Sequence, residues 1–238
     1  MTIQQDKNKL SQSNLSFVHE LISKGEYKEA LTGLDKLTQS HPKDPTLYLL
    51  GGNCYRLLGH PDQAIICYQE AIKLKSDFAD AHNNLGVIFY DSNKINEAIL
   101  CYQEAINVDP DFADAHNNLA NCLAELSRPE EAIESYKKAI ESRPDFVDAY
   151  NNLGTTLKNI ARPEEAIESY KKAIEIRPDY LIAYSNLASI LNELGRNEEA
   201  NKFYSKARGE NKDYEQGILL LKKKNFNEAI IFFEKSHF

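Results

Sequence analysis

The segment DAHNNLGVIFY, residues 80–90, recurs with changes as DAHNNLANCLA at residues 114–124 and as DAYNNLGTTLK at residues 148–158. The three copies start 34 residues apart, and each carries two adjacent asparagines inside a pattern typical of an amphipathic helix. Asparagine in a helix costs about 0.7 kcal/mol relative to alanine. A sequence that accepts this cost at one fixed spacing indicates a repeat architecture.

The 34-residue period extends over most of the chain. In five consecutive windows the eighth residue is glycine or alanine, the twentieth and twenty-seventh are alanine, and the twenty-fourth is tyrosine. The windows begin at Pro45, Ala79, Ala113, Val147 and Leu181, and their tyrosines are Tyr68, Tyr102, Tyr136, Tyr170 and Tyr204. The predicted organisation is a polar N-terminal tail over residues 1–10, repeats at about 11–44, 45–78, 79–112, 113–146, 147–180 and 181–209, and a partial repeat at 210–238.

Turn residues divide each window into two helical stretches. A left-handed turn that ends the first helix is expected at the fifteenth position, which holds Gly59, Asn93, Ser127, Ala161 and Gly195. Pro144 and Pro178 are expected to end the second helix, and the aspartate after each is expected to cap the next one. The sequence therefore predicts an all-α stack of helical hairpins that is stabilised mainly by contacts between neighbours.

The window pattern resembles the tetratricopeptide repeat family, whose 34-residue units combine small and aromatic residues at such positions and close with proline. The resemblance implies a right-handed α-solenoid of tandem helix-turn-helix hairpins, in which the first helices line a concave groove. The paired asparagines also resemble those in the superhelical arrays of O-linked N-acetylglucosaminyltransferases, where groove asparagines hold the backbones of substrate proteins.

The asparagines are candidate groove residues because of their place on the helical wheel. The second, sixth, ninth and thirteenth residues of a window lie opposite the side that packs within the hairpin. The predicted peptide-binding groove contains Asn84, Asn118, Asn152 and Asn186 at the sixth position, Asn83, Asn117 and Asn151 at the border of the packed side, and Asn53 and Asn121. A carboxamide can pair with both the C=O and the N–H of an extended peptide. Alanine at Asn118 and Asn152 is expected to weaken peptide binding while leaving stability unchanged or slightly higher. Alternatively, duplication copied exposed asparagines that bind nothing.

An acidic row accompanies the asparagines at the second position of three windows. It consists of Asp80, Asp114 and Asp148. Such a row favours a neutral or basic peptide as the partner. The alternative is that these aspartates stabilise the N-terminal turn of each helix through its dipole.

The paired asparagines are absent from the window that begins at Pro45, where Leu49 and Leu50 take their places. The groove is expected to become apolar there. Leu50 could receive a hydrophobic side chain of a ligand, or it could pack beneath the N-terminal hairpin, which is the favoured interpretation.

Composition limits the class of protein. The chain of 238 residues has a net charge of −8, which argues against nucleic acid or an anionic membrane as the main partner. No apolar run approaches the roughly 20 residues of a membrane span, and the N-terminus lacks the apolar core of a signal peptide. The cysteines Cys54, Cys67, Cys101 and Cys122 form no close pair. They are interpreted as reduced core thiols of a cytoplasmic protein.

No catalytic motif is present, and the sequence predicts neither a catalytic residue, a cofactor nor a metal site. His82 and His116 lie one repeat apart, but both occupy the packed side of the helix, which favours buried histidines over ligands. The predicted function is a non-catalytic protein–protein interaction scaffold. The alternative is the substrate-recruiting arm of a larger enzyme, such as an O-GlcNAc-type glycosyltransferase.

The C-terminal segment NEAIIFFEKSHF, residues 227–238, is more apolar than the corresponding helices before it. Ile231, Phe232 and Phe238 are expected to form an exposed interface. Such an interface would serve self-association or continuation into a longer parent chain. The alternative is that this segment folds back and buries itself.

Overall fold

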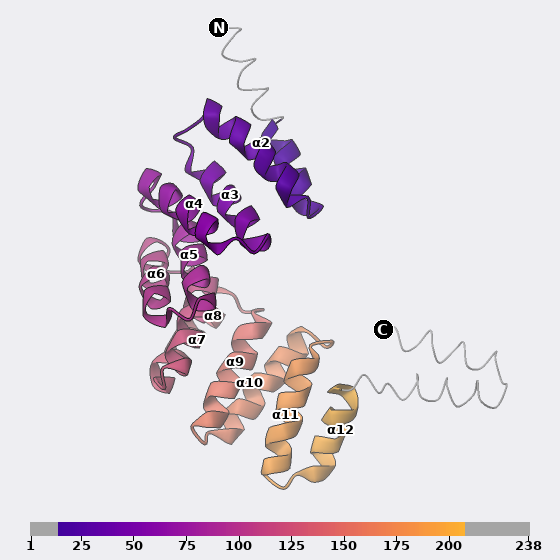
Figure 1. The fold of residues 1–238 in the computed structure, drawn as a ribbon. Helices are drawn as coiled ribbons and strands as arrows, with labels where there is room; N and C mark the ends of the chain where they lie inside the picture. Colours follow the sequence, from indigo (N-terminus) through magenta and orange to yellow (C-terminus); the bar gives the residue numbers. More distant parts are fainter. Residues whose placement is uncertain (1–13, 208–238) are drawn as a thin grey trace, which may run out of the picture. The chain divides into compact units, whose positions relative to one another are not determined.

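The computed structural model describes residues 14–207, and this part of the chain contains helices and no strands. Residues 14–23 are helical, and the next helices are α2 (Tyr27–Ser40), α3 (Pro45–Leu57), α4 (Pro61–Leu74), α5 (Ala79–Asp91), α6 (Ile95–Val108), α7 (Ala113–Glu125), α8 (Pro129–Ser142), α9 (Val147–Asn159), α10 (Pro163–Ile176), α11 (Leu181–Glu193) and α12 (Asn197–Ala207) (Figure 1). Within this described part, no helix is long and apolar enough to cross a membrane. The proposed C-terminal interface of Ile231, Phe232 and Phe238 lies outside the described residues.

Consecutive helices pack as hairpins: α3 with α4, α5 with α6, α9 with α10, and α11 with α12. The prediction of an all-α array of tandem hairpins is therefore confirmed. The chain divides into two compact units, residues 1–126 and residues 127–238, and each is described by itself. The helices α3, α5, α7, α9 and α11 start at the first residues of the five sequence windows.

The turns that end the first helices have the predicted left-handed backbone. Gly59 and Gly195 have φ values of 77° and 75°, whereas Ser127 and Ala161 adopt φ 58° despite their Cβ atoms. At Gly59, the N–H groups of Gly59 and His60 donate to the carbonyls of Arg56 and Tyr55 at 3.0 and 2.9 Å, which closes the helix with a Schellman motif. A left-handed conformation costs an L-residue about 1–2 kcal/mol, so Ser127 and Ala161 are strained positions.

The expected aspartate caps on α9 and α11 were wrong. These helices begin after Phe146 and Tyr180, and neither N-cap makes a side-chain hydrogen bond to the backbone. The aspartates lie one residue too early, and the aromatic caps are covered by cations instead. The Arg143 guanidinium lies 4.4 Å from the ring centroid of Phe146, and that of Arg177 lies 5.3 Å from that of Tyr180.

In the hairpins α3–α4, α5–α6 and α9–α10, a tyrosine ring of the second helix packs on a glycine of the first helix. Tyr68, Tyr102, Tyr136 and Tyr170 are 0–2% exposed. A Cβ built on Gly86 would lie 2.7 Å from the Tyr102 ring, and one on Gly52 would overlap the Tyr68 ring. Glycine at the eighth position of these windows therefore lets the two helices approach closely.

A matched pair of substitutions in α3 tests this contact. Gly51 and Gly52 are both buried, but a Cβ on Gly51 would lie at an ordinary 3.6 Å from Cys67 Sγ. Both alanine variants gain the same helix propensity, which cancels in the comparison. We expect Gly52→Ala to be about 1–3 kcal/mol less stable than Gly51→Ala, because only the former overpacks the tyrosine. Denaturant unfolding measures the difference, and equal stabilities would show that the ring moves aside freely.

A second pair tests the strained turn. Ala161→Gly should raise the free energy of unfolding by about 0.5–1 kcal/mol, because relief of the left-handed strain exceeds the entropy cost of glycine. The reverse change, Gly195→Ala, should destabilise by a similar amount, since a Cβ there meets no atom within 4 Å and only the backbone conformation penalises it. Urea unfolding that shows Ala161→Gly to be neutral or destabilising would contradict the assigned turn.

Candidate functional site

The first helices line the inner side of each unit. In the first unit α3 contacts α5 and α5 contacts α7, and in the second unit α9 contacts α11. Within the described residues of each unit, the second helices of neighbouring hairpins make at most marginal contacts with one another. Each stack therefore bends toward its first helices. We call the side of α3, α5, α7, α9 and α11 that faces away from the second helices the inner face.

The sixth-position asparagines reach back to the preceding hairpin instead of projecting freely. In the first unit, Nδ2 of Asn118 donates to Oδ1 of Asn83 at 3.1 Å, and Nδ2 of Asn84 donates to Oδ1 of Asn53 at 3.0 Å. Asn83 in turn donates to Asn84 at 3.4 Å, a longer and weaker contact. These bonds form a continuous chain of carboxamides across α7, α5 and α3. We call these inter-repeat hydrogen bonds, together with their counterparts in the second unit, the carboxamide ladder.

The second unit repeats this arrangement. Nδ2 of Asn186 donates to Oδ1 of Asn151 at 2.9 Å, and Asn151 donates to Asn152 at 3.4 Å. The fifth-position residues, which the wheel put at the border of the packed side, are 6–7% exposed and hence buried; they are Asn83, Asn117 and Asn151. At Asn83 and Asn151 the helix penalty is thus offset by hydrogen bonds between neighbouring repeats, whereas the buried Oδ1 of Asn117 has no hydrogen-bond partner among the described residues.

The sixth-position carboxamides are half-buried and keep hydrogen-bonding capacity. A carboxamide has two donor hydrogens and an oxygen with two lone pairs. The bonds of Asn84 and Asn118 to neighbouring asparagines use one hydrogen and one lone pair of each. One donor and one acceptor of these side chains thus remain for a ligand on the inner face.

The ladder changes the expected effect of alanine at these positions. Asn118→Ala would leave the buried Oδ1 of Asn83 without its donor, which costs about 1–3 kcal/mol against a gain of about 0.7 kcal/mol in helix propensity. We expect a net loss of about 1 kcal/mol. Asn107→Ala on the exposed side of α6 is the control and should be neutral or slightly stabilising. If thermal melting shows both variants to be equally stable, the ladder contributes nothing to the fold.

Tyrosine hydroxyls also reach this face, which sequence reasoning did not find. The Tyr68 hydroxyl donates to Oδ1 of Asn53 at 2.8 Å, and the Tyr170 hydroxyl bonds Oγ1 of Thr155 at 3.2 Å. Burial raises the pKa of Tyr68 to about 12, although the nearby charge of Arg56 opposes this rise. A polar residue fifteen positions before each of these tyrosines is the sequence signal that could have indicated the contact.

The acidic row is only partly open to solvent. Asp80, Asp114 and Asp148 lie in the first turns of α5, α7 and α9, where the helix dipole favours a carboxylate. Asp148 accepts a hydrogen bond of 2.7 Å from the Tyr180 hydroxyl, and burial together with this bond raises the pKa of Tyr180 to about 12. Of the three aspartates, Asp80 is exposed and the other two are half-buried.

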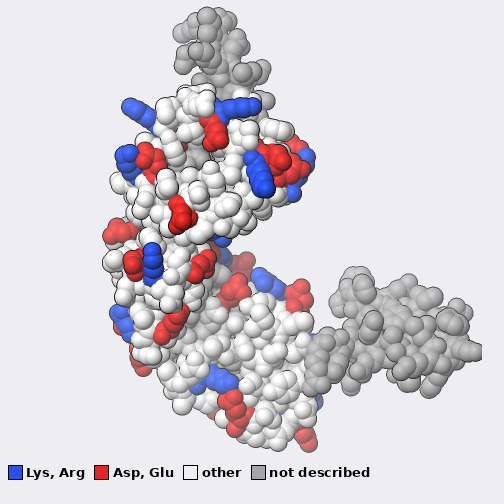
Figure 2. Space-filling model, in the orientation of Figure 1, with Lys and Arg blue, Asp and Glu red and all other residues white. Residues whose placement is uncertain are grey.

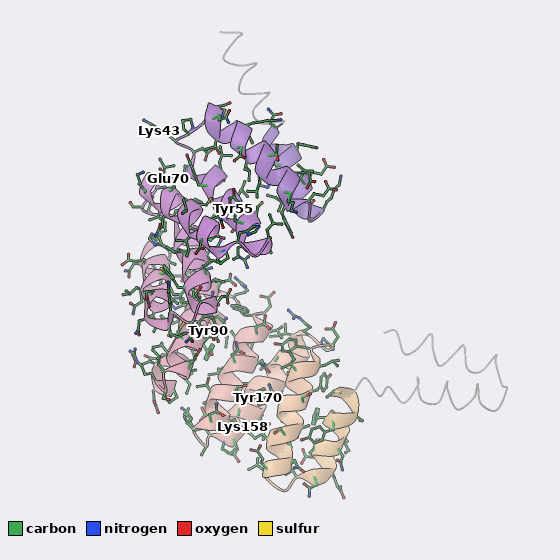
Figure 3. All side chains as sticks on the ribbon, in the orientation of Figure 1. Lys43, Tyr55, Glu70, Tyr90, Lys158 and Tyr170 are labelled. Carbon is green, nitrogen blue, oxygen red and sulfur yellow. The ribbon has the colours of Figure 1, made fainter. Side chains whose placement is uncertain are left out.

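Side chains farther along the first helices pair between repeats. Nζ of Lys158 lies 2.7 Å from Glu193 and donates to Oγ of Ser189 at 3.1 Å, and the hydrogen bond from Lys158 lowers the pKa of Glu193. Burial raises the pKa of Tyr90, and the nearby Glu125 carboxylate raises it further. Lys158 and Tyr170 lie close together on the second unit (Figure 3).

The leucines at the N-terminal end of the face are packed. Leu50 lies against a core cluster that includes Val18 and Leu34 of the N-terminal hairpin, and Leu49 lies against the cluster that contains Tyr68. The packing interpretation of Leu50 is therefore favoured over a ligand contact. Leu57 remains 48% exposed at the end of α3.

The histidines and cysteines have structural surroundings. Nε2 of His82 lies 3.0 Å from the Ser76 carbonyl, and Nε2 of His116 lies 2.9 Å from the Pro110 carbonyl. The described residues contain no group of three or more His, Cys, Asp or Glu side chains placed to hold a metal ion. The four thiols are free, with Cys54 and Cys122 buried and Cys67 and Cys101 half-buried. Burial raises the pKa of Cys67, Cys101 and Cys122 to about 11, which keeps these thiols protonated at neutral pH.

Comparisons with known proteins agree with this architecture. A family model described as TPR repeat matches residues 52–92 and 88–127, and models described as tetratricopeptide repeat match residues 113–146, 147–180 and 169–200. No curated protein matches the chain. These findings leave the likeness to glycosyltransferase arrays as a prediction.

Several solved structures resemble the chain. A crystal structure of MamA is 27% identical, with a TM-score of 0.62, over 70% of this chain and 91% of that one. YrrB, described as a TPR protein with an unusual peptide-binding site, is 26% identical, with a TM-score of 0.57, over 71% and 88%. PilF of Pseudomonas aeruginosa, at 14% identity, shares the fold over 97% and 99% with a TM-score of 0.75. With family models matching from residue 52 to residue 200, the chain belongs to the tetratricopeptide repeat family.

Proposed function

We propose that the chain is a non-catalytic interaction scaffold whose inner face binds an extended peptide segment of another protein. The observation that carries this proposal is the row of half-buried carboxamides on consecutive first helices. Asn84 and Asn118 in the first unit keep a donor and an acceptor beyond the bonds of the ladder. An extended peptide offers a backbone C=O and N–H at matching intervals, and each such bond contributes about 0.5–1.5 kcal/mol.

The ladder itself prepares the carboxamides for binding. Because the side chains of Asn84, Asn118 and Asn186 are bonded to the preceding repeat, their rotamers are set before a ligand arrives. A ligand then loses less affinity to the ordering of side chains. Recognition through backbone groups would tolerate many peptide sequences, which suits a scaffold.

Similar proteins support a peptide-binding role. YrrB is described as having a peptide-binding site, and its TPR repeats resemble this chain at 26% identity. This support is an analogy of fold, and fold alone does not determine function, so a role for this chain depends on its own side chains. No observation in the described residues favours the alternative of a substrate-recruiting arm of an enzyme.

A neutral to basic segment suits the charges of the inner face. Asp80 and Asp91 on α5 are exposed, whereas Lys158 on α9 is paired with Glu193. In Figure 2 the side of the second unit that faces the viewer is mostly uncharged. Nucleic acid and anionic membranes are poor partners for a chain with a net charge of −8.

Peptide selection tests the proposal. A library of random short peptides is displayed on phage and selected on the immobilised full chain, and the enriched peptides are titrated into isotope-labelled protein. We expect the side-chain amide signals of Asn84, Asn118 and Asn186 to shift, while that of Asn107 on α6 stays in place. The double replacement of Asn84 and Asn118 with alanine should weaken binding by about 1–3 kcal/mol, from two to four lost hydrogen bonds.

Circular dichroism on each variant separates lost binding from lost structure. Peptides that shift only signals of the second helices would place the binding surface elsewhere. Equal affinity for the double variant and the wild-type chain would show that the carboxamides serve the fold alone.

A further inference from the structure

Two aliphatic side chains are exposed at the same position of consecutive second helices. Ile66 on α4 and Leu100 on α6 are 65% and 62% exposed, more than any other large hydrophobic side chain of the described residues. Both are the twenty-second residue of their windows, and both helices pack against α5 (Figure 1). They therefore lie on neighbouring helices of the first unit, away from the inner face. We call Ile66 and Leu100 the outer pair.

The second unit has charged residues at this position. Glu134 on α8 and Glu168 on α10 are the twenty-second residues of their windows, and both are exposed. The position that follows also differs, because it holds the half-buried thiols of Cys67 and Cys101 in the first unit and serines in the second. The repeat thus accepts glutamate on the exposed side of its second helix, and its architecture does not require the outer pair.

Carboxylates flank the outer pair. Residues three and four positions apart are neighbours on the surface of a helix. Asp62 lies four residues before Ile66, while Glu97 and Glu104 lie three residues before and four residues after Leu100. All three carboxylates are exposed, and within the described residues none of them forms an ion pair. We call Asp62, Glu97 and Glu104 the acidic rim.

The cation nearest to the outer pair is already neutralised. Lys73 is the only lysine or arginine of α4 and α6, and its Nζ lies 2.9 Å from Glu70. On α10, by contrast, Glu168 at the position of the outer pair is itself paired with Lys171 at 3.5 Å. The first unit therefore combines an apolar centre with a negative rim that has no counter-charge of its own.

This combination selects among the possible partners. A second copy that brought the same face would place carboxylates opposite carboxylates, which opposes association. Two aliphatic side chains also supply only a small part of the roughly 800 Å² that each partner contributes to a stable interface. An anionic membrane would meet the same repulsion. A basic amphipathic helix fits, because it satisfies its own backbone hydrogen bonds and presents one apolar stripe.

We propose that the outer pair binds an amphipathic helix of another protein whose apolar stripe is bordered by lysine or arginine. The stripe covers Ile66 and Leu100, and the cations face the acidic rim. The chain then holds two partners, one on the inner face and one on this outer surface, as a scaffold does. The two surfaces share no residue, so this inference does not depend on peptide binding by the inner face.

The test uses the full chain with labelled isoleucine and leucine methyl groups. The probe is a synthetic helical peptide of about 20 residues, with a leucine stripe bordered by lysines. We expect a saturable shift of the Ile66 and Leu100 methyl signals, and binding that weakens as sodium chloride is added. The signal of Ile182, which is 56% exposed on α11, should stay in place. A peptide with glutamates in place of the lysines should bind at least tenfold more weakly, and equal affinity for both peptides would overturn the proposal.

Matched variants locate the site. Ile66→Glu should weaken binding of the lysine peptide by about tenfold, because the carboxylate would be buried against the leucine stripe. Ile182→Glu makes the same change at another exposed isoleucine and should leave the affinity unchanged. Replacing Glu97 and Glu104 together with glutamine should weaken binding by about twofold to fivefold and reduce its salt dependence. Circular dichroism on each variant checks the fold, which already accepts glutamate at the position of Ile66 in α8 and α10.

Three further results would overturn the inference. Equal losses for Ile66→Glu and Ile182→Glu would show that the peptide has no defined site. Dimers of the wild-type chain that Ile66→Glu dissociates in sedimentation experiments would show that a second copy covers the outer pair. Methyl signals of Ile66 and Leu100 that a soluble paramagnetic probe fails to broaden would show that the chain covers them itself. Peptide binding by the inner face is followed separately through the amide signal of Asn84, so failure of one proposal leaves the other intact.

Discussion

The contact between a tyrosine ring of the second helix and a glycine of the first helix sets the geometry of this chain. The ring of Tyr102 occupies the space that a Cβ on Gly86 would need, and Tyr68 and Tyr170 are placed likewise. This contact fixes the distance between the two helices of a hairpin. The hydroxyl groups of Tyr68 and Tyr170 reach the inner face, where they form hydrogen bonds with polar side chains of the first helix. Packing within the hairpin and the chemistry of the inner face are therefore coupled through one residue type.

The carboxamide ladder connects the hairpins to one another. It runs from Asn118 through Asn83 and Asn84 to Asn53, so that each repeat holds the next through side chains that also form the proposed binding surface. A solenoid is stabilised by contacts between neighbours, and polar contacts of this kind specify register as well as adding stability. The arrangement implies that a ligand which uses the remaining donors and acceptors would bind a surface whose side chains are already ordered.

The two units differ in whether the charged side chains of the inner face are paired within the protein or exposed to solvent. In the second unit, Lys158 is neutralised by Glu193, and Asp148 is bonded by Tyr180. In the first unit, Asp80 and Asp91 on α5 are exposed.

The sequence by itself determined the helices, the turns and the hairpins, because these depend on local chemistry that recurs every 34 residues. The left-handed turn at Gly59 and the small residue opposite each tyrosine could be predicted in this way, since backbone sterics and helix spacing act over a few residues. A helical wheel also placed the sixth-position asparagines away from the side that packs within the hairpin. The wheel could not show that Asn83 is buried and accepts from Asn118, because that bond joins residues of two repeats and depends on how closely their first helices approach.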